Sequence, residues 1–193
     1  MAWHKGEWWP LYVPEWYSPR VSQYFFDPYS FTHILHGVFF YGLLGWWPQL
    51  IWGNSWWWVW LAGPGVSFLL ELAHEFLENS DRVIQMYRTK SGTSGLYQGD
   101  SIQNIIGDLV SCTFGWYLSA LCVHFGVWWL ILVWTIVSEL ALVFYMRDSL
   151  FLILFQLTFN IQAIKTWQAE KVPAHGKPQT NQDEIDALKS HPS

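Results

Sequence analysis

Four long apolar stretches in the chain are each close to the length that a helix needs to cross a lipid bilayer. They cover about Phe31–Leu50, Trp56–Leu77, Ile102–Phe125 and Val127–Met146. None contains a lysine or an arginine, yet together they hold the carboxylates Glu71, Glu75, Asp108 and Glu139. A carboxylate in hydrocarbon costs roughly 2.5–3.5 kcal/mol on insertion scales, so these groups need protons, histidines, a metal ion or a polar network around them. The pattern therefore predicts a membrane bundle with a polar interior.

The composition agrees with a membrane protein, because 52% of the 193 residues are hydrophobic, 20% are aromatic and only 13% are charged. We expect an aromatic-rich interfacial segment over 1–30, a transmembrane helical domain over 31–168 and a polar tail over 169–193. The N-terminal stretch lacks the continuous apolar core of a cleavable signal peptide, so we expect the first span to direct insertion. No phosphate-binding loop and no nucleic-acid signature is present.

A fifth apolar block over 151–164 is shorter and carries polar residues, so we expect a short, re-entrant or interfacial helix beside four spanning ones. The predicted fold is therefore all-α, an integral membrane four-helix bundle with this fifth helix. In that topology all ten Lys and Arg residues lie on one side. Both termini should then face the cytoplasm, or the equivalent side of an organelle inner membrane. If the fifth block spans, the four lysines from Lys165 onward cross over and this bias weakens.

The 16 tryptophans fit the same layout. Six lie between Trp46 and Trp58, and Trp128 and Trp129 should join them at the end that carries no charge. Aromatic belts of this kind anchor a protein at the membrane interface, so we expect contacts with membrane lipids and assign these residues no chemistry.

Polar residues recur at helical spacing within the spans and predict one chamber. Glu71, Glu75 and Glu78 share a helix face with His74 at its edge, and Asn104 and Asp108 are spaced four apart. Because the polar ends of all four spans reach the same half of the membrane, we expect their side chains to converge. The candidate ligand-binding residues are His33, His36, Glu71, Glu75, Glu78, Asn79, Arg88, Tyr97, Asp100, Ser101, Asn104, Asp108, Glu139, Arg147 and Asp148.

A divalent metal ion is the cofactor that this chamber suggests, with zinc, iron or manganese as candidates and His33, His36, Glu71 and Glu75 as ligands. Glu71 and His74 have the three-residue spacing of carboxylate di-metal bundles, but such sites use two Glu/His pairs and only one exists here. The metalloprotease pattern fails because Glu78 stands where a second histidine is needed. The alternative is a structural network, in which Arg147 pairs with Asp148 or Glu139.

The order and spacing of several segments resemble a family of small bacterial inner-membrane proteins that is defined by a domain of unknown function. The resemblance covers roughly residues 22–168 and rests on DPYSFTHILHGVFFYGLL (27–44), ELAHEFLENSDRVIQMYR (71–88), YQGDSIQNIIGDLVSCTFGW (97–116), MRDSL (146–150) and AIKTWQ (163–168). It points to the chamber residues above and adds Gly37, Ser80, Tyr87, Gly99 and Trp167. His74 stands where the family is expected to have an aromatic residue, which weakens the Glu71/His74 pair. A more distant likeness is to the VanZ-like membrane proteins, which are linked to the cell envelope.

Two functions of different class follow. In the first, the chamber binds a polar ligand, a metal ion or a lipid head group, and Arg88 or Arg147 contacts an anionic group. If the chamber also acts on a lipid-linked substrate, a histidine or carboxylate would serve as general base. In the second, the chain is an accessory subunit of a larger membrane complex of respiratory or photosynthetic type, with its aromatic residues at interfaces. Ion transfer along the acidic stripe is weaker, since the opposite side offers no charged exit.

Overall fold

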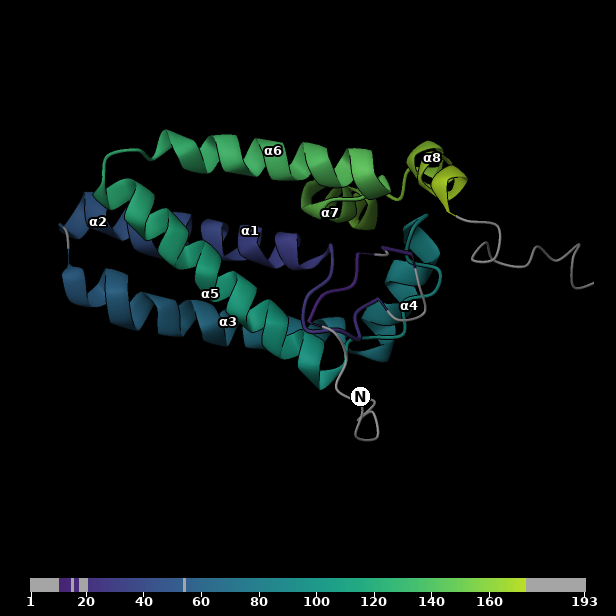
Figure 1. Ribbon diagram of the computed structural model, residues 1–193, viewed down its shortest axis with the longest axis horizontal. Helices are drawn as coiled ribbons and strands as arrows, with labels where there is room; N and C mark the ends of the chain where they lie inside the picture. The colour runs from purple at the N-terminus through teal and green to yellow at the C-terminus, as the bar shows by residue number, and fades with distance from the viewer. Residues whose placement is uncertain (1–10, 15, 18–20, 54, 173–193) are drawn as a thin grey trace, which may run out of the picture.

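The computed structural model describes residues 11–14, 16–17, 21–53 and 55–172, and over these the chain is helical (Figure 1). The one pairing of extended backbone in this part of the chain is an isolated bridge between Tyr12 and Phe26. The elements are α1 (Ser30–Phe40), η1 (Tyr41–Trp46), α2 (Trp47–Trp52), η2 (Trp58–Ala62), α3 (Gly63–Glu78), α4 (Asp81–Lys90), α5 (Ile102–His124), α6 (Trp129–Met146), α7 (Leu150–Phe159) and α8 (Gln162–Lys171).

Four long helical segments match the four apolar stretches of the sequence. Helices α1, η1 and α2 follow one another without a break over 30–52, and residues 56–78 form a second continuous segment that ends with α3. The third and fourth segments are α5 and α6. In the described part of the chain, α5 and α6 are the two helices that are long and apolar enough to cross a membrane. The prediction of an all-helical fold is confirmed. That all four segments span a membrane remains a prediction.

Helix α5 crosses α1 and α3 diagonally, and this crossing forms the centre of the molecule (Figure 1). Two glycines allow the backbones of α1 and α5 to touch. A Cβ atom added to Gly37 would lie 1.9 Å from the carbonyl oxygen of Cys112, and one added to Gly115 would lie 2.0 Å from that of Ile34. The contact therefore excludes any side chain at these positions and brings the polar faces of the two helices together.

The interior of this crossing is polar, and the outer faces are apolar. On α3, Ser67, Glu71 and Glu75 are buried, whereas Leu69 and Phe76 are exposed by 63% and 62%. This distribution is the reverse of a helix in a soluble protein, which turns its apolar stripe inward. The carboxylate stripe predicted from the sequence therefore does face the interior at Glu71 and Glu75.

The fifth apolar block forms two helices rather than the one expected over 151–164. Helix α7 ends at Phe159, the next residue, Asn160, has a left-handed backbone (φ 49°), and α8 begins at Gln162. The buried Gln156 causes this division, because its amide nitrogen donates to the carbonyl oxygen of Ile161 and its amide oxygen accepts from the Ile161 N–H, at 3.0 and 3.1 Å. At about 1.5 Å per residue, α7 is near 15 Å long, which is too short to span a bilayer.

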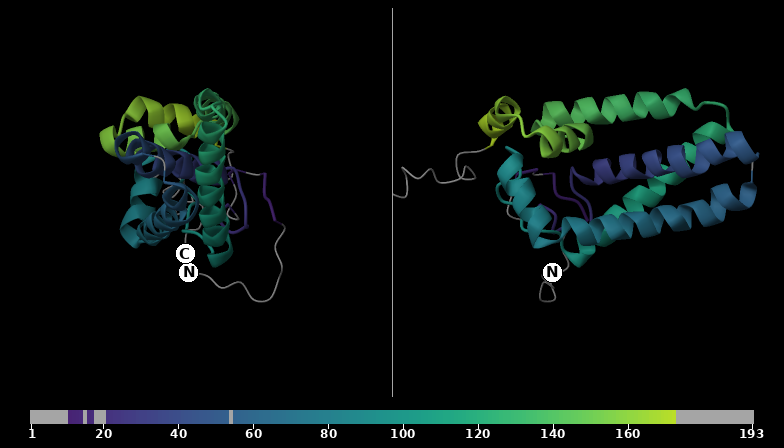
Figure 2. Two further views of the ribbon diagram at one scale, coloured as in Figure 1. Left: turned by 90° about the vertical axis from the view of Figure 1, so that its left-hand side faces the viewer. Right: turned by 180° about the vertical axis from the view of Figure 1, so that it is seen from behind.

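Helices α4, α7 and α8 gather at one end of the long helices, which Figure 2 shows again from behind. The loop 91–101 and the described part of the N-terminal segment lie at the same end. Most of the predicted N-terminal interfacial segment before residue 21 lies outside the described residues, as does the polar tail after residue 172. The prediction that both termini lie on one side therefore also falls outside them.

Candidate functional site

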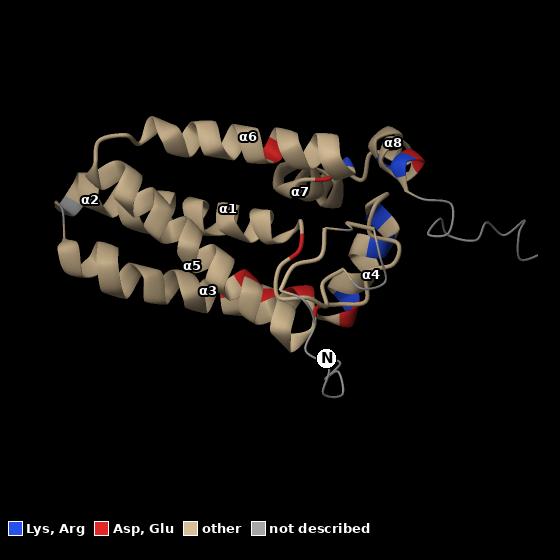
Figure 3. Ribbon diagram, in the orientation of Figure 1, with Lys and Arg blue, Asp and Glu red and all other residues tan. Residues whose placement is uncertain are grey.

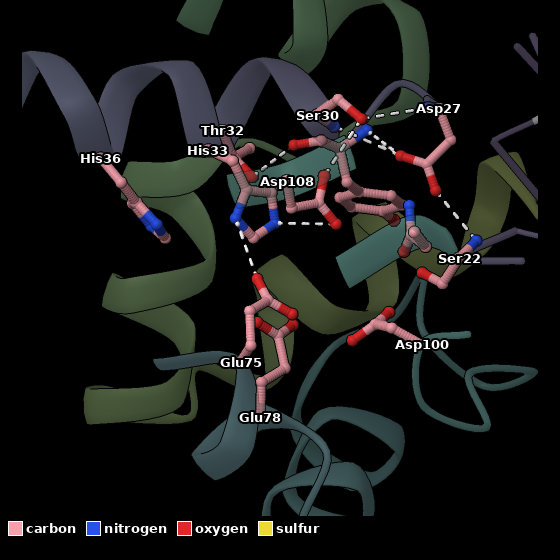
Figure 4. A network of polar contacts seen from close by, with 12 residues as sticks. Ser22, Asp27, Ser30, Thr32, His33, His36, Glu75, Glu78, Asp100 and Asp108 are labelled. Atoms are coloured by element: carbon pink, nitrogen blue, oxygen red, sulfur yellow. Dashed lines mark hydrogen bonds and ion pairs between the residues drawn. The ribbon is translucent and has the colours of Figure 1, made fainter. Parts of the chain in front are cut away.

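Four buried ionisable side chains from three helices meet where α1, α3 and α5 cross. They are His33 from α1, Glu71 and Glu75 from α3, and Asp108 from α5, and each is at most 7% exposed. The Nδ1 atom of His33 lies 2.6 Å from Glu71 Oε1 and 3.4 Å from Glu75 Oε1, and its Nε2 atom lies 3.8 Å from Asp108 Oδ2. Figure 4 shows the imidazole of His33 between Glu75 and Asp108. One histidine therefore faces three carboxylates.

A second imidazole joins the same carboxylate. His36 lies almost one turn after His33 on α1, and its Nδ1 atom is 3.0 and 3.1 Å from the two oxygens of Glu71. The spacing of three residues puts both rings on one face of the helix, with their centroids 5.1 Å apart. The side-chain ligand atoms of His33, His36 and Glu71 all lie within 4.8 Å of one another, as do those of His33, Glu75 and Asp108.

Glu75 is the side chain in this cluster whose hydrogen bonding is incomplete. It is 1% exposed, and neither of its carboxylate oxygens has a hydrogen-bond partner. The Nδ2 atom of the buried Asn104 also lacks one. A buried carboxylate without partners is strongly unfavourable unless it binds a proton or a cation. The cluster therefore contains a buried carboxylate that accepts no hydrogen bond and lies 3.4 Å from His33 Nδ1.

The carboxylate oxygen of Asp108 that does not face His33 is held by a chain of hydrogen bonds that the sequence did not predict. The hydroxyl of Ser30 donates to Asp108 Oδ1 at 3.2 Å and accepts from the Asp27 N–H at 3.1 Å. Asp27 accepts in turn from the N–H groups of Ser22 and Tyr29, at 2.9 and 2.8 Å. Burial raises the pKa of Asp27, and these backbone donors oppose that rise. The Asp-Pro-x-Ser sequence at the start of a helix is a recognisable pattern for such a capping group.

The predicted residues at the ends of α3 and α5 form the rim of the cluster. Asp100 accepts from Asn79 Nδ2 and from the Tyr97 hydroxyl, both at 2.8 Å. Burial and the nearby charge of Glu78 raise the pKa of Asp100 to about 7. Ser101 caps α5 by accepting from the Asn104 N–H at 3.1 Å.

His74 and Arg88 take part in other contacts than those expected. His74 Nε2 lies 3.0 Å from Glu78 Oε2, so it pairs along α3 with Glu78 and not with Glu71. Arg88 Nε donates to the carbonyl oxygen of Tyr97 at 2.5 Å, which ties α4 to the loop before α5. The Glu71/His74 pair is therefore not a ligand pair in this structure.

The structure places Glu139, Arg147 and Asp148 in a separate cluster near α7 and α8. Glu139 accepts from the N–H groups at the start of α7, at 3.1 and 3.2 Å. Arg147 pairs with Glu170 at 3.0 Å, with its guanidinium 5.0 Å from the ring centroid of Trp167. Asp148 accepts from Thr93, Ser149 and Gln168. The polar ends of three helices, rather than four, therefore meet in the chamber, and Arg147 pairs with neither Asp148 nor Glu139.

Comparison with known proteins gives the family. The family model described as "Protein of unknown function (DUF2585)" matches residues 3–170. The chain belongs to this family. A UPF0314 protein of Sphingopyxis alaskensis is 38% identical over 152 residues, covering 79% of this chain and 74% of the relative. Another, from Paracoccus denitrificans, is 31% identical over 167 residues, which is 82% of this chain and 76% of that protein.

The relatives are bacterial, and a third example is the UPF0314 protein Atu8092 of Agrobacterium fabrum, 34% identical over 158 residues and covering 82% of this chain and 74% of that protein. The resemblance to a bacterial family defined by a domain of unknown function is thus confirmed. No solved structure matches the chain. The geometry of the cluster therefore has to carry the functional argument.

Proposed function

We propose that this protein is a multi-pass membrane protein that holds a divalent transition-metal ion between α1, α3 and α5, with His33, His36, Glu71 and Glu75 as ligands. The observation that carries the proposal is Glu75, whose buried carboxylate oxygens accept no hydrogen bond and which lies 3.4 Å from an imidazole nitrogen that also contacts Glu71. A cation bound there would satisfy Glu75 together with the other three side chains.

The donor set suits a transition metal. Two imidazoles and two carboxylates match the ligand preferences of zinc, manganese and ferrous iron. Metal–ligand bonds of about 2.0–2.2 Å in a tetrahedral site require ligand atoms roughly 3.3–3.6 Å apart. The distance from His33 Nδ1 to Glu75, 3.4 Å, lies in this range, whereas Glu71 Oε1 lies 2.6 and 3.0 Å from the two imidazoles and would move apart from them on binding the metal. In the described residues, these carboxylates pair only with histidine and with no lysine or arginine.

Asp108 is assigned a positioning role. It lies on the Nε2 side of His33, opposite the nitrogen that faces Glu71 and Glu75. A histidine that binds a metal through one nitrogen commonly has its other nitrogen oriented by a carboxylate. The hydrogen bond from Ser30 fixes Asp108 for this task.

The membrane assignment rests on length, surface and charge. At about 1.5 Å per residue, the continuous helical segments 30–52 and 56–78 are each roughly 34 Å long, enough for a bilayer, like α5 and α6. Their outer faces expose large apolar side chains. The described lysines and arginines lie at the end that carries α4 and α8 (Figure 3). This asymmetry supports a cytoplasmic position for that end, with both termini on the same side.

Metal analysis of the full-length protein, purified in detergent and dialysed against Zn²⁺ or Mn²⁺, tests the proposal. We expect about one metal ion per chain, and at least a tenfold loss of affinity in Glu75→Gln and in His33→Ala. The matched control is Glu139→Gln, which makes the same chemical change in a helix outside the cluster. The proposal is wrong if the folded wild-type protein binds neither metal, or if both cluster variants bind as well as the control.

A native mass of the same sample tests the other function predicted from the sequence. A metal-free protein that purifies with other membrane proteins in fixed stoichiometry would support an accessory subunit. The buried acids would then form a structural polar network.

A further inference from the structure

A separate pocket lies at the end of the bundle, between the described N-terminal segment, the corner of α3 and α4, and the loop before α5. Its volume is about 50 Å³. Because one water molecule needs about 10–15 Å³ by this measure, the pocket has room for a few waters or one small polar group. Aromatic rings and one acid dominate its lining, which includes Trp16, Tyr17, Tyr29, Tyr87, Tyr97 and Glu78.

The rings in this pocket stand at steep angles to one another. Tyr87 and Tyr97 have centroids 5.7 Å apart and an interplanar angle of 87°, and the angle between Trp16 and Tyr17 is 68°. Perpendicular rings form the walls of a cage. The face of each ring carries partial negative charge, so such a cage attracts a cation that sits close to the faces.

A carboxylate adds formal negative charge to the partial negative charge of the ring faces. Among the described residues that line the pocket, Glu78 is the one that carries a charge, and this charge is negative. Two further acids stand behind the wall, with Asp100 accepting from the Tyr97 hydroxyl and Asp148 accepting from Thr93. Among the described residues next to the wall, His74 lies 3.0 Å from Glu78 on the α3 side and offsets part of its charge, and Arg88 donates to the Tyr97 carbonyl oxygen. Glu78 is therefore the described charge that lines the pocket, and the faces of the aromatic rings add to its negative potential.

We propose that this pocket binds a small organic ammonium group, with the cation held by the rings of Tyr87 and Tyr97 and by the carboxylate of Glu78. An aromatic wall selects an alkylated ammonium over a bare metal ion, because hard metal ions need several oxygen ligands. The lining residues from α3, α4 and the loop before α5 lie at the end of the bundle where Figure 3 shows the described lysines and arginines and where lipid head groups would lie. The ammonium group therefore belongs either to a zwitterionic phospholipid or to a free amine. This site is distinct from the metal centre and does not depend on it.

Calorimetric titration of the full-length protein in a sugar-headed detergent tests this inference, with tetramethylammonium and choline as probes and sodium chloride at equal ionic strength as the reference. We expect both ammonium ions to bind. Tyr87→Leu should weaken binding about tenfold, because a ring over a desolvated cation contributes on that scale. Tyr87→Phe keeps the ring and should restore the affinity to within about threefold.

Two further variants complete the design. Glu78→Gln keeps the side-chain shape, should weaken binding about tenfold, and replaces Tyr87→Leu as the decisive variant if that protein aggregates. Tyr117→Leu makes the same aromatic-to-aliphatic change on α5 outside the pocket and should leave binding unchanged. The inference is overturned if neither ammonium ion binds, if sodium competes equally, or if Glu78→Gln and Tyr87→Leu bind like the wild-type protein.

Nanodiscs distinguish the two sources of the ammonium group. Choline affinity is measured in discs of phosphatidylglycerol and in discs that also contain phosphatidylcholine. Weaker choline binding in the second lipid identifies the phospholipid head group as the ligand. Equal affinity in both identifies a free amine.

Discussion

Helices α5 and α6 are both apolar enough to cross a membrane, but they bury very different surfaces. Helix α5 buries a polar and small-residue face that includes Asn104, Asp108 and Gly115. Helix α6 buries Ser138, Leu142 and Met146, and leaves most of its large apolar side chains exposed. On α5, small and polar residues therefore pack closely beside apolar ones such as Trp116, whereas most apolar side chains of α6 stay on the outside. That is the expected behaviour where the surrounding medium is itself apolar, because burying an aliphatic side chain then gains little.

The largest effect should come from the closest contact on α5. Gly115→Leu places a side chain where even a Cβ atom would lie 2.0 Å from the Ile34 carbonyl oxygen, so α1 and α5 must separate. We expect loss of monodisperse protein in size-exclusion chromatography. The control is Gly65→Ala on α3, where an added Cβ atom meets no other atom within 4 Å, and this variant should keep the wild-type profile. A folded Gly115→Leu protein would contradict the tight crossing.

Introducing a charged residue tests whether the exposed face of α6 lies in lipid. Val137 is 57% exposed, and Val137→Lys should cost roughly 2.5–3.5 kcal/mol of insertion free energy if α6 faces lipid. The measurement is membrane insertion of α6 in a glycosylation-reporter assay, with Val137→Leu as the control. Equal insertion of both variants would mean that this face of α6 does not lie in hydrocarbon.

The corner between α6 and α7 should make stability depend on pH. Burial raises the pKa of Asp148 to about 7, whereas an aspartate in an unfolded chain titrates near 4. The folded protein then binds the proton more tightly, so this group makes the free energy of unfolding fall as the pH rises from about 4 to 7. The difference between wild type and Asp148→Asn isolates the effect.

The measurement for Asp148 is the thermal transition in detergent at pH 5 and pH 8. We expect the wild-type transition to fall more between these two values than that of Asp148→Asn. The same fall in both proteins would show that Asp148 ionises normally.

The smallest effect should come from the cap of α5. Ser101 accepts from the Asn104 N–H, so Ser101→Ala should cost about 1 kcal/mol of stability, measured by denaturant titration in detergent. Ser80 precedes α4 without making such a bond, because its hydroxyl donates to the Leu77 carbonyl oxygen. Ser80→Ala should therefore cost less. The reverse order would contradict the assigned cap.

Local patterns predicted the helices and part of the cluster. The four-residue spacing of Glu71 and Glu75 put both on one face, and the three-residue spacing of His33 and His36 did the same on α1. These patterns depend only on helical geometry. Ser30 and Asp27 were missed because a serine or aspartate at a helix start is most often only a cap. The second role of Ser30 is to donate to Asp108, which is 78 residues away in the sequence, and this contact exists only in the folded chain.

The sequence by itself determined the four long helical segments and the polar face of each. It also determined that these segments carry acids but no lysine or arginine. The tertiary structure decided which of those faces meet. The polar faces of α1, α3 and α5 meet because Gly37 and Gly115 allow α1 and α5 to approach closely. Glu139 instead accepts a hydrogen bond at the start of α7. The physical reason is that periodicity sets the direction of a side chain around its own helix axis, whereas its neighbour depends on how closely two backbones can approach.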